Sequence, residues 1–392
     1  MATLGDYIRI KHGFAFKGDY ITTEDNGIVL VTPGNFEIGG GFKEKKCKFF
    51  STEYPSEYVL HAGDLIVTMT DLSKQGDTLG YSALVPNTDR VYLHNQRIGL
   101  VDVYNPEADK DYIYWYMRTP RYQKTIVATA SGSTVKHTSP SRICEVEIDL
   151  PPLAVQKKIA ATLTVIDQKI QSNNRINDNL QQQALAIFQQ EIIRDGELSE
   201  GWECGSLLDI ANYLNGLAMQ KFRPADGEVG LPVLKIKELR QGSCDASSEL
   251  CSPNIKQEYI VHDGDVIFSW SGSLLVDFWC GDTCGLNQHL FKVTSDKYPK
   301  WFYYAWTAHH LARFVAIAAD KATTMGHIKR EELAKAEVII PDAASMERIG
   351  GVLRPMYDLI ISNRVENRKL AALRDTILPQ LMSGELEVSD LT

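Results

Sequence analysis

The most distinctive chemical feature of the sequence is a basic tract that occurs twice. Residues 112–144 contain no Asp or Glu, but they carry five Lys or Arg residues among Ser, Thr and His side chains. Residues 299–330 carry five Lys or Arg and a single acidic residue. Lys, Arg and hydroxyl groups hold phosphates, and side chains that donate and accept hydrogen bonds read base edges. The repeated tract therefore predicts two local DNA-binding surfaces, with a merely solvated face as the alternative.

The residues of the two tracts divide by expected role. Those expected to enter a DNA groove are Thr134, Lys136 and His137 in the first tract and Thr324, His327 and Lys329 in the second. Those expected to contact phosphates are Arg118, Arg121, Lys124, Lys321 and Arg330.

Further candidates have equally plain structural explanations. Lys43, Lys45 and Lys46 form a smaller basic cluster, for which a lysine-rich edge strand is an alternative. The pairs Asn95-Gln96 and Asn287-Gln288 could read adenine, although we expect them to be buried polar pairs at strand ends. The aromatic residues at 112–116 and 301–306 are expected to be helix core rather than a surface for stacking bases.

Motifs for catalysis are missing from the sequence. It has no Gly-rich nucleotide-binding fingerprint, no phosphate-binding Gly-Lys-Ser/Thr and no Gly-x-Ser-x-Gly. The second half contains Cys244, Cys251, Cys280 and Cys284, but their spacing departs from that of zinc sites and the first half has no counterpart. We therefore predict free thiols, no metal site and no catalytic residue.

Composition sets limits on the class of protein. The chain has 392 residues, enough for two or three domains, and a net charge of −9, so any DNA binding must be local. Seven cysteines without regular spacing and a start that lacks the features of a signal peptide indicate a cytoplasmic protein. No apolar run approaches the length of a membrane span.

An internal duplication organises these features. Ala62-Gly63-Asp64-Leu65-Ile66 is matched by Asp263-Gly264-Asp265-Val266-Ile267, and from Thr134 onward a constant offset of 190 residues relates the two copies. Each copy combines an α/β region of about 150 residues with one long helix that begins after a proline. The fold class is therefore predicted to be α/β (α+β), with two tandem globular domains.

The two predicted helices share a heptad-like apolar seam, which contains Asn173 and Asn177 in the first and Asn363 and Asn367 in the second. An Asn in such a seam costs stability unless a partner bonds to it, so we expect the four to meet in an antiparallel coiled coil with pseudo-two-fold symmetry. The alternative is that each helix packs only on its own domain.

Local sequence around the helices resembles the specificity subunits of type I restriction-modification systems. Ile148-Asp149-Leu150-Pro151-Pro152-Leu153-Ala154-Val155-Gln156 looks like the first helical repeat of that family, and Ile339-Ile340-Pro341 looks like the start of the second. Leu378-Pro379-Gln380-Leu381-Met382-Ser383-Gly384 is similar to the family's C-terminal ending. The second helix departs from the pattern at Asp342 and Met346.

The resemblance implies a subunit without an active site of its own. Residues 1–150 and 197–340 would be target-recognition domains, and residues 151–196 and 341–392 would be spacer helices, the second with the C-terminal tail. The partners would be double-stranded DNA, two adenine-N6 methyltransferase subunits and two endonuclease subunits, with S-adenosylmethionine, ATP and magnesium bound by the protein partners. Two globes that differ in loops and contact residues imply an asymmetric bipartite target. A self-contained nuclease or methyltransferase, and a coiled-coil scaffold that never touches DNA, remain as alternatives.

Overall fold

The computed structural model describes residues 2–193, 198–320 and 328–388, with the side chain of residue 320 excepted, and it divides the chain into two compact units. Unit 1 comprises Met1–Gln168 and Ala372–Thr392, and unit 2 comprises Lys169–Ala371. The long helices are α4 (Leu153–Glu191) and α10 (Ala343–Ser383). Each unit therefore contains one globular region and a segment of both long helices.

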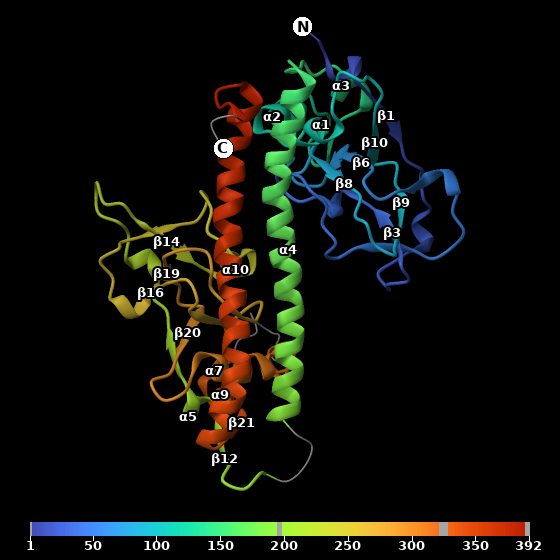
Figure 1. The fold of residues 1–392 in the computed structure, drawn as a ribbon. Coiled ribbons are helices and arrows are strands. Elements are labelled where there is room, and N and C mark those ends of the chain that lie inside the picture. The colour runs from blue at the N-terminus through green and yellow to red at the C-terminus, as the bar shows by residue number, and fades with distance from the viewer. Residues whose placement is uncertain (1, 194–197, 321–327, 389–392) are drawn as a thin grey trace. The chain divides into compact units, whose positions relative to one another are not determined.

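Unit 1 contains two small sheets, of which Figure 1 labels strands β1, β10, β6, β8, β3 and β9, and a short ribbon. Its strands are β1 (Ile8–His12), β2 (Ile21–Thr22), β3 (Ile28–Val31), β4 (Lys48–Phe50), β5 (Val59–Leu60), β6 (Leu65–Thr68), β7 (Thr70–Asp71), β8 (Ser82–Leu84), β9 (Val91–His94), β10 (Ile98–Val103) and β11 (Lys136–His137). The first sheet is antiparallel in the order β1-β10-β6-β8. The second has the order β2-β4-β3-β9-β5 and is parallel only between β3 and β9. The ribbon pairs β7 with β11.

Three short helices cover the first sheet of unit 1: α1 (Lys110–Tyr116), α2 (Pro120–Ala128) and α3 (Pro140–Cys144). Each begins with a side-chain cap, from Asp109, Thr119 and Ser139 respectively, which satisfies an otherwise unpaired amide of the first turn. Tyr112 and Trp115 of α1 are each 1% exposed, which confirms that the first aromatic group is helix core.

Unit 2 repeats the architecture with its own strands and helices. The strands are β12 (Glu203–Ser206), β13 (Asn212–Asn215), β14 (Leu231–Leu234), β15 (Leu250–Cys251), β16 (Ile260–Val261), β17 (Val266–Ser269), β18 (Leu275–Phe278), β19 (Cys284–Leu286), β20 (Leu290–Thr294) and β21 (Glu337–Ile340). The short helices are α5 (Leu207–Ile210), α6 (Ile236–Gln241), α7 (Lys300–His309), α8 (Leu311–Asp320) and α9 (Arg330–Ala334). The sheet orders are β13-β20-β17-β18 and β15-β14-β19-β16, and β12 pairs with β21.

The strand orders confirm the internal duplication. β13-β20-β17-β18 follows the same path through the chain as β1-β10-β6-β8, and β14–β19 is a parallel pair like β3–β9. In unit 1, β7 follows β6 and pairs with β11 in the ribbon. In unit 2, α6 follows β14.

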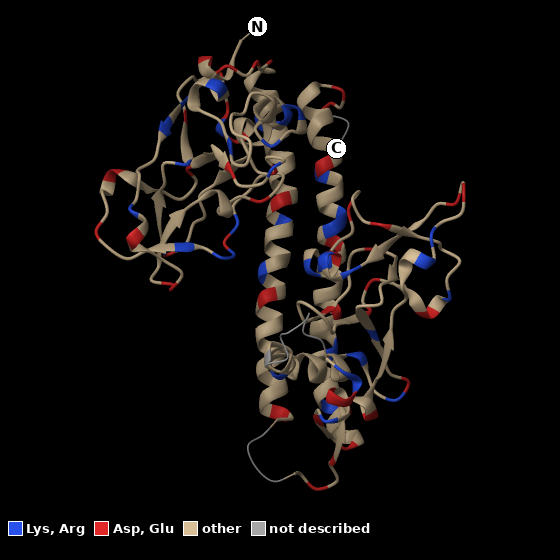
Figure 2. Cartoon of the chain, turned by 180° about the vertical axis from the view of Figure 1, so that it is seen from behind, with Lys and Arg blue, Asp and Glu red and all other residues tan. Residues whose placement is uncertain are grey.

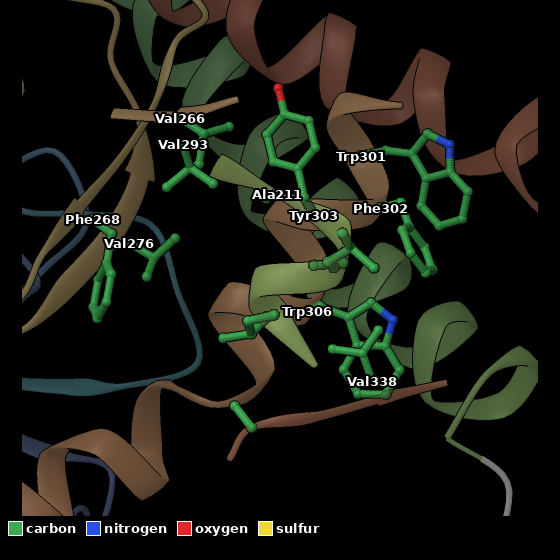
Figure 3. Close-up of a cluster of buried hydrophobic side chains, with 14 of the residues drawn as sticks. Ala211, Val266, Phe268, Val276, Val293, Trp301, Phe302, Tyr303, Trp306 and Val338 are labelled. Carbon is green, nitrogen blue, oxygen red and sulfur yellow. The ribbon is translucent and has the colours of Figure 1, made fainter. Parts of the chain in front are cut away.

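The core of unit 2 is dominated by aromatic side chains (Figure 3). Trp301, Phe302, Tyr303 and Trp306 of α7 are buried together, and Val338 of β21 belongs to the same cluster. The second aromatic group is therefore also helix core, as predicted.

Hydrogen bonds attach the start of each long helix to the globular region that precedes it, but the side chain that forms them differs between the two units. In unit 1 the buried Gln156 amide accepts from the Asp109 backbone N–H at 2.8 Å and donates to the carbonyls of Glu107 and Pro151, both at 2.8 Å. In unit 2 the Asp342 carboxylate accepts from the backbone N–H groups of Ala344 and Ser345, at 2.9 and 3.0 Å, and from Trp202 Nε1. These hydrogen bonds lower the pKa of Asp342 below its ordinary value. Asp342 and Met346 stand where unit 1 has Pro152 and Gln156. The start of α10 is therefore fixed by a capping carboxylate, whereas the start of α4 is fixed by a side-chain amide.

Within unit 2 the Asn residues of the two helices bond to one another. Asn173 donates to Asn367 Oδ1 at 2.8 Å, and Asn363 donates to Asn177 Oδ1 at 2.9 Å. Asn367 in turn donates to Asn174 Oδ1 at 2.8 Å. Residue numbers rise along α4 as they fall along α10, so these two segments run antiparallel (Figure 1).

Candidate nucleic-acid interface

An open groove in unit 1 gathers polar side chains from four parts of the chain. It is lined by His12, Gly13, Met69, Thr70, Gln96, Arg97, His137 and Thr138. These residues belong to the end of β1, the segment from β6 to β7, the turn between β9 and β10, and the strand β11 with the residue that follows it. The groove therefore presents imidazole, amide, guanidinium and hydroxyl groups from one concave surface.

The loop of residues 131–138 forms one side of this groove. Ser131 and His137 exchange two backbone hydrogen bonds, of 3.0 and 2.9 Å, and the Thr70 hydroxyl lies 3.2 Å from His137 Nδ1. Between them Gly132 has φ +96°, and a Cβ there would lie 2.0 Å from the Val135 carbonyl oxygen, so the tight loop requires glycine. Thr134 and His137 are exposed and Lys136 is half-buried, so the three predicted groove residues lie together on this loop.

A buried carboxylate supports the neighbouring loop. Asp71 is 4% exposed and accepts from the backbone N–H of Ser73 at 2.6 Å and from the backbone N–H and hydroxyl of Thr78, both at 2.5 Å. Burial raises the pKa of Asp71, but these hydrogen bonds outweigh burial and hold the pKa below its ordinary value. The loop of residues 71–78 is therefore closed around an ionised side chain.

The turn between β9 and β10 displays two exposed side chains, Gln96 and Arg97. We expected Gln96 to be buried and made no prediction for Arg97. Asn95 is half-buried and its Oδ1 accepts from the Arg97 backbone N–H at 3.0 Å, but Gln96 and Arg97 are both exposed. The expectation of a buried Asn-Gln pair is therefore wrong for Gln96. The sequence signal that could have revealed it is the turn itself, because an Asn that bonds the backbone two residues later turns the intervening side chain outward.

Two predicted phosphate contacts, Arg121 and Lys124, are exposed on the surface of α2. Figure 2 shows acidic and basic positions interspersed within each unit, so the basic excess is restricted to short segments such as this one.

The prediction that Arg118 of the same tract contacts a phosphate is wrong. Its side chain is 3% exposed, lies over the Trp115 ring at 4.3 Å, and donates to the Gly39 carbonyl and the Asp167 carboxylate, both at 2.8 Å. Arg374 pairs with the other oxygen of Asp167 at 2.5 Å. Burial raises the pKa of Asp167, but the two guanidinium groups outweigh burial and lower it below its ordinary value. Arg118 is thus committed to a buried ion-pair network and cannot reach a phosphate.

The lysine cluster lies in the segment that leads into β4. Lys45 and Lys46 are exposed, whereas Lys43 pairs with Glu37 at 3.4 Å. β4 lies between β2 and β3 in its sheet, so the alternative of a lysine-rich edge strand is wrong.

Unit 2 contains the counterpart of the β9–β10 turn between β19 and β20. Asn287 is 6% exposed and its Oδ1 accepts from the His289 backbone N–H at 3.2 Å. Gln288 is half-buried and His289 is exposed, and the Ser271 hydroxyl lies 3.2 Å from His289 Nδ1. Trp270 stands where Met69 stands in unit 1, and its indole N–H donates to Asn215 at 3.0 Å.

The predicted contacts of the second tract are only partly described. Lys329 and Arg330 are exposed at the start of α9. Lys321, Thr324 and His327 lie outside the described residues.

The four cysteines considered as a zinc site are buried or half-buried free thiols. Cys251, Cys280 and Cys284 are buried and Cys244 is half-buried, all without disulfides. Burial raises the pKa of the Cys280 thiol to about 11 and strongly raises that of Cys284, so both stay protonated.

Among the described residues, no three His, Cys, Asp or Glu side chains lie together in an arrangement that could hold a metal ion. Among the helices of the same residues, none combines the length and the apolarity needed to cross a bilayer.

Known proteins match this chain over both units. The family model of the type I restriction modification DNA specificity domain matches twice, at residues 1–182 and 199–372. The chain is 25% identical over 303 residues to the type I restriction enzyme MjaIX specificity subunit of Methanocaldococcus jannaschii, covering 72% of this chain and 70% of that protein. It is 23% identical over 420 residues to the EcoBI specificity subunit of Escherichia coli, covering 96% of this chain and 84% of that protein.

A solved structure supports the same assignment at the level of the fold. The crystal structure of the type I restriction-modification system S subunit from M. genitalium superposes with a TM-score of 0.62 at 15% identity, covering 97% of this chain and 94% of that one. Since the family model matches both copies and the strand order is duplicated, this chain belongs to the type I restriction-modification specificity subunits, the non-catalytic components that recognise DNA.

Proposed function

We propose that this chain reads an asymmetric, bipartite DNA target, one half-site with each globular region, for a type I restriction-modification complex. The observation that carries the proposal is that two units with one strand order present different side chains around the same turn, Arg97 in unit 1 and His289 in unit 2. Two units that share a backbone arrangement but carry different base-contacting side chains are expected to recognise different half-site sequences.

In unit 1 the proposed groove contacts are Thr134, Lys136 and His137, and the proposed phosphate contacts are Arg121 and Lys124. Their support is that His137 lines the polar groove, that all of them except the half-buried Lys136 are exposed, and that the tract is basic. The proposed set also retains Lys45, Lys46, Lys329 and Arg330, which are exposed, and Lys321, Thr324 and His327.

We further propose that α4 and α10 pair along their length as an antiparallel coiled coil with pseudo-two-fold symmetry. Support comes from the Asn173–Asn367 and Asn177–Asn363 hydrogen bonds in unit 2. In unit 1, apolar residues from the start of α4 and the end of α10 share one core, among them Leu163 and Leu381. A helix of about 40 residues spans about 60 Å, so such a pair would act as a ruler between the half-sites.

The helices would also dock two adenine-N6 methyltransferase subunits and two endonuclease subunits. S-adenosylmethionine, ATP and magnesium would be bound by those partners rather than by this chain.

The test is a genome-wide map of N6-methyladenine in the host, with and without this gene. Loss of one split motif on deletion, restored by the wild-type gene, is the expected result. An unchanged map while the partner methyltransferase is expressed and active would contradict the proposal. The matched control is deletion of that methyltransferase gene, which must remove the same motif.

A further inference from the structure

Resting on the proposed DNA recognition, we infer that the second and third residues of the two equivalent turns, Gln96-Arg97 and Gln288-His289, read the bases of the two half-sites. In this arrangement the glutamine reads adenine in both halves, while the third residue distinguishes them, with Arg97 reading guanine.

The first argument is that both turns are held by the same backbone hydrogen bonds. In unit 1 the Phe14 N–H donates to the His94 carbonyl at 2.8 Å, and the Gln96 N–H donates back to the Phe14 carbonyl at 2.9 Å. In unit 2 the Leu217 N–H donates to the Leu286 carbonyl, and the Gln288 N–H donates to the Leu217 carbonyl, both at 2.9 Å. Each turn is thereby fixed from outside by a segment that forms an isolated β-bridge with it, through Phe14 in unit 1 and Leu217 in unit 2.

This bridging segment can approach so closely only because a glycine precedes the bridged residue. A Cβ at Gly13 would lie 2.3 Å from the Asn95 carbonyl oxygen, and a Cβ at Gly216 would lie 2.3 Å from the Asn287 carbonyl oxygen. Backbone groups form both contacts, so no side chain can move aside. Both copies have therefore kept a rigid backbone support for the two residues that follow Asn95 and Asn287.

The second argument is that the side chains of Gln96 and Arg97 form no polar interaction with the residues of unit 1 that the structure describes. Across the described part of the chain, neither the Gln96 amide nor the Arg97 guanidinium has a hydrogen-bond or ionic partner. Arg118 and Arg90, by comparison, pair with Asp167 and Asp25. Arg97 lines the open groove as an unpaired cation.

The third argument is chemical. A glutamine amide can both accept from adenine N6 and donate to adenine N7, and a guanidinium can donate to guanine O6 and N7 together. The Ser271 hydroxyl lies 3.2 Å from His289 Nδ1, and the Gln288 amide nitrogen lies 3.4 Å from His289 Nε2, so a base would have to replace the Gln288 contact to reach Nε2. A single imidazole atom makes one base contact where Arg97 makes two.

The experiment selects bound sequences from a library of random DNA duplexes, using this full chain assembled with its methyltransferase. Arg97→Ala is expected to lower discrimination at one base pair of one half-site by about 5- to 100-fold and to leave the other half-site unchanged. His289→Ala should act in the other half-site only. His289→Arg should create a preference for guanine at the corresponding position.

Arg121→Ala is the matched control, since this exposed arginine of the same unit lies on α2, outside the turn. It should weaken binding to all selected sequences without changing the motif. A split motif for the wild type that Arg97→Ala, Gln96→Ala and His289→Arg all leave unchanged overturns the inference alone. No selected motif for the wild-type assembly overturns the proposed function, and the inference with it.

Discussion

The two units share a strand order, yet different side chains fasten each globular region to the long helices. Unit 1 uses the buried Arg118–Asp167–Arg374 network. Unit 2 uses two ion pairs from α10, Arg364 with Asp277 at 2.6 Å and Arg368 with Asp263 at 2.8 Å. The strand order is the same in both copies because backbone hydrogen bonds depend little on side-chain identity. The attachment to the helices differs because many combinations of side chains can join a globular region to a helix.

A second contrast lies where α7 meets α10. In unit 2 Trp301 packs so closely on Gly350 that a Cβ there would lie 2.8 Å from the indole nitrogen. Since α1 begins at Lys110 and α7 at Lys300, Asp111 matches Trp301, and Ala160 matches Gly350 at the 190-residue offset. The larger aromatic residue and the smaller helix residue have therefore changed together.

The largest expected effect is that of Asp167→Ala. It would leave the buried Arg118 guanidinium without its counter-charge, so unit 1 should lose about 3–5 kcal/mol of stability. Hydrogen–deuterium exchange by mass spectrometry would report this loss in peptides of unit 1 while those of the unit 2 globe keep their protection. Lys169→Ala, which breaks the exposed pair with Glu366, is the control and should change little. Equal protection of Asp167→Ala and wild type would show that the network does not hold unit 1.

The Trp301 contact predicts opposite effects at two neighbouring glycines. Gly350→Ala should destabilise unit 2 by about 1–3 kcal/mol, because its new methyl group overlaps the indole. Gly351→Ala meets nothing within 4 Å and should stabilise the helix by about 0.5–1 kcal/mol. Urea unfolding of both variants measures the difference. The same sign for both variants would refute close packing at this site.

Asp71 makes unit 1 sensitive to acid, whereas Gly272, which stands at the same position in unit 2 by the match of Trp270 with Met69, carries no titratable group. Asp71→Asn should cost about 1 kcal/mol near neutral pH, since hydrogen bonds to a charged acceptor are stronger. The folded-state pKa of Asp71 lies below its ordinary value, so its contribution is present above the ordinary pKa and is lost as pH falls through the folded value. Thermal unfolding of wild type and variant should therefore converge as pH falls below about 4. A gap that stays constant down to pH 2 would contradict the role of the carboxylate.

The smallest effect concerns salt. Arg121→Ala should reduce the slope of log affinity against log salt by about 0.9, as loss of one phosphate contact does. Arg330→Ala should do the same through unit 2. Titration of a selected duplex at several salt concentrations measures both slopes. Arg354→Ala, an exposed arginine of α10 outside the proposed set, should leave the slope unchanged.

Much of the fold could be predicted, because its signals are local or repeated. The long helices are visible from their heptad spacing and preceding prolines, and they span 39 and 41 residues as observed. The aromatic residues at 112–116 and 301–306 are predictable as core because their spacing suits a helix face.

The candidate site was only partly predictable. The loop with Thr134, Lys136 and His137 stands out by composition, but the charge of Arg118 is the same whether it is buried or exposed. Only the position of Asp167, 49 residues away in the sequence, decides that Arg118 is an interior residue.

The sequence by itself determined the duplication, the helix lengths and the absence of known catalytic motifs, because these depend on residue types at short or constant spacing. The tertiary structure decided which cations are free to meet DNA, and it placed Gln96 and Arg97 in a groove with His12 and His137. Such a grouping depends on strand register and on close backbone crossings such as that at Gly13. Those are set by packing between segments far apart in the chain, which no local pattern records.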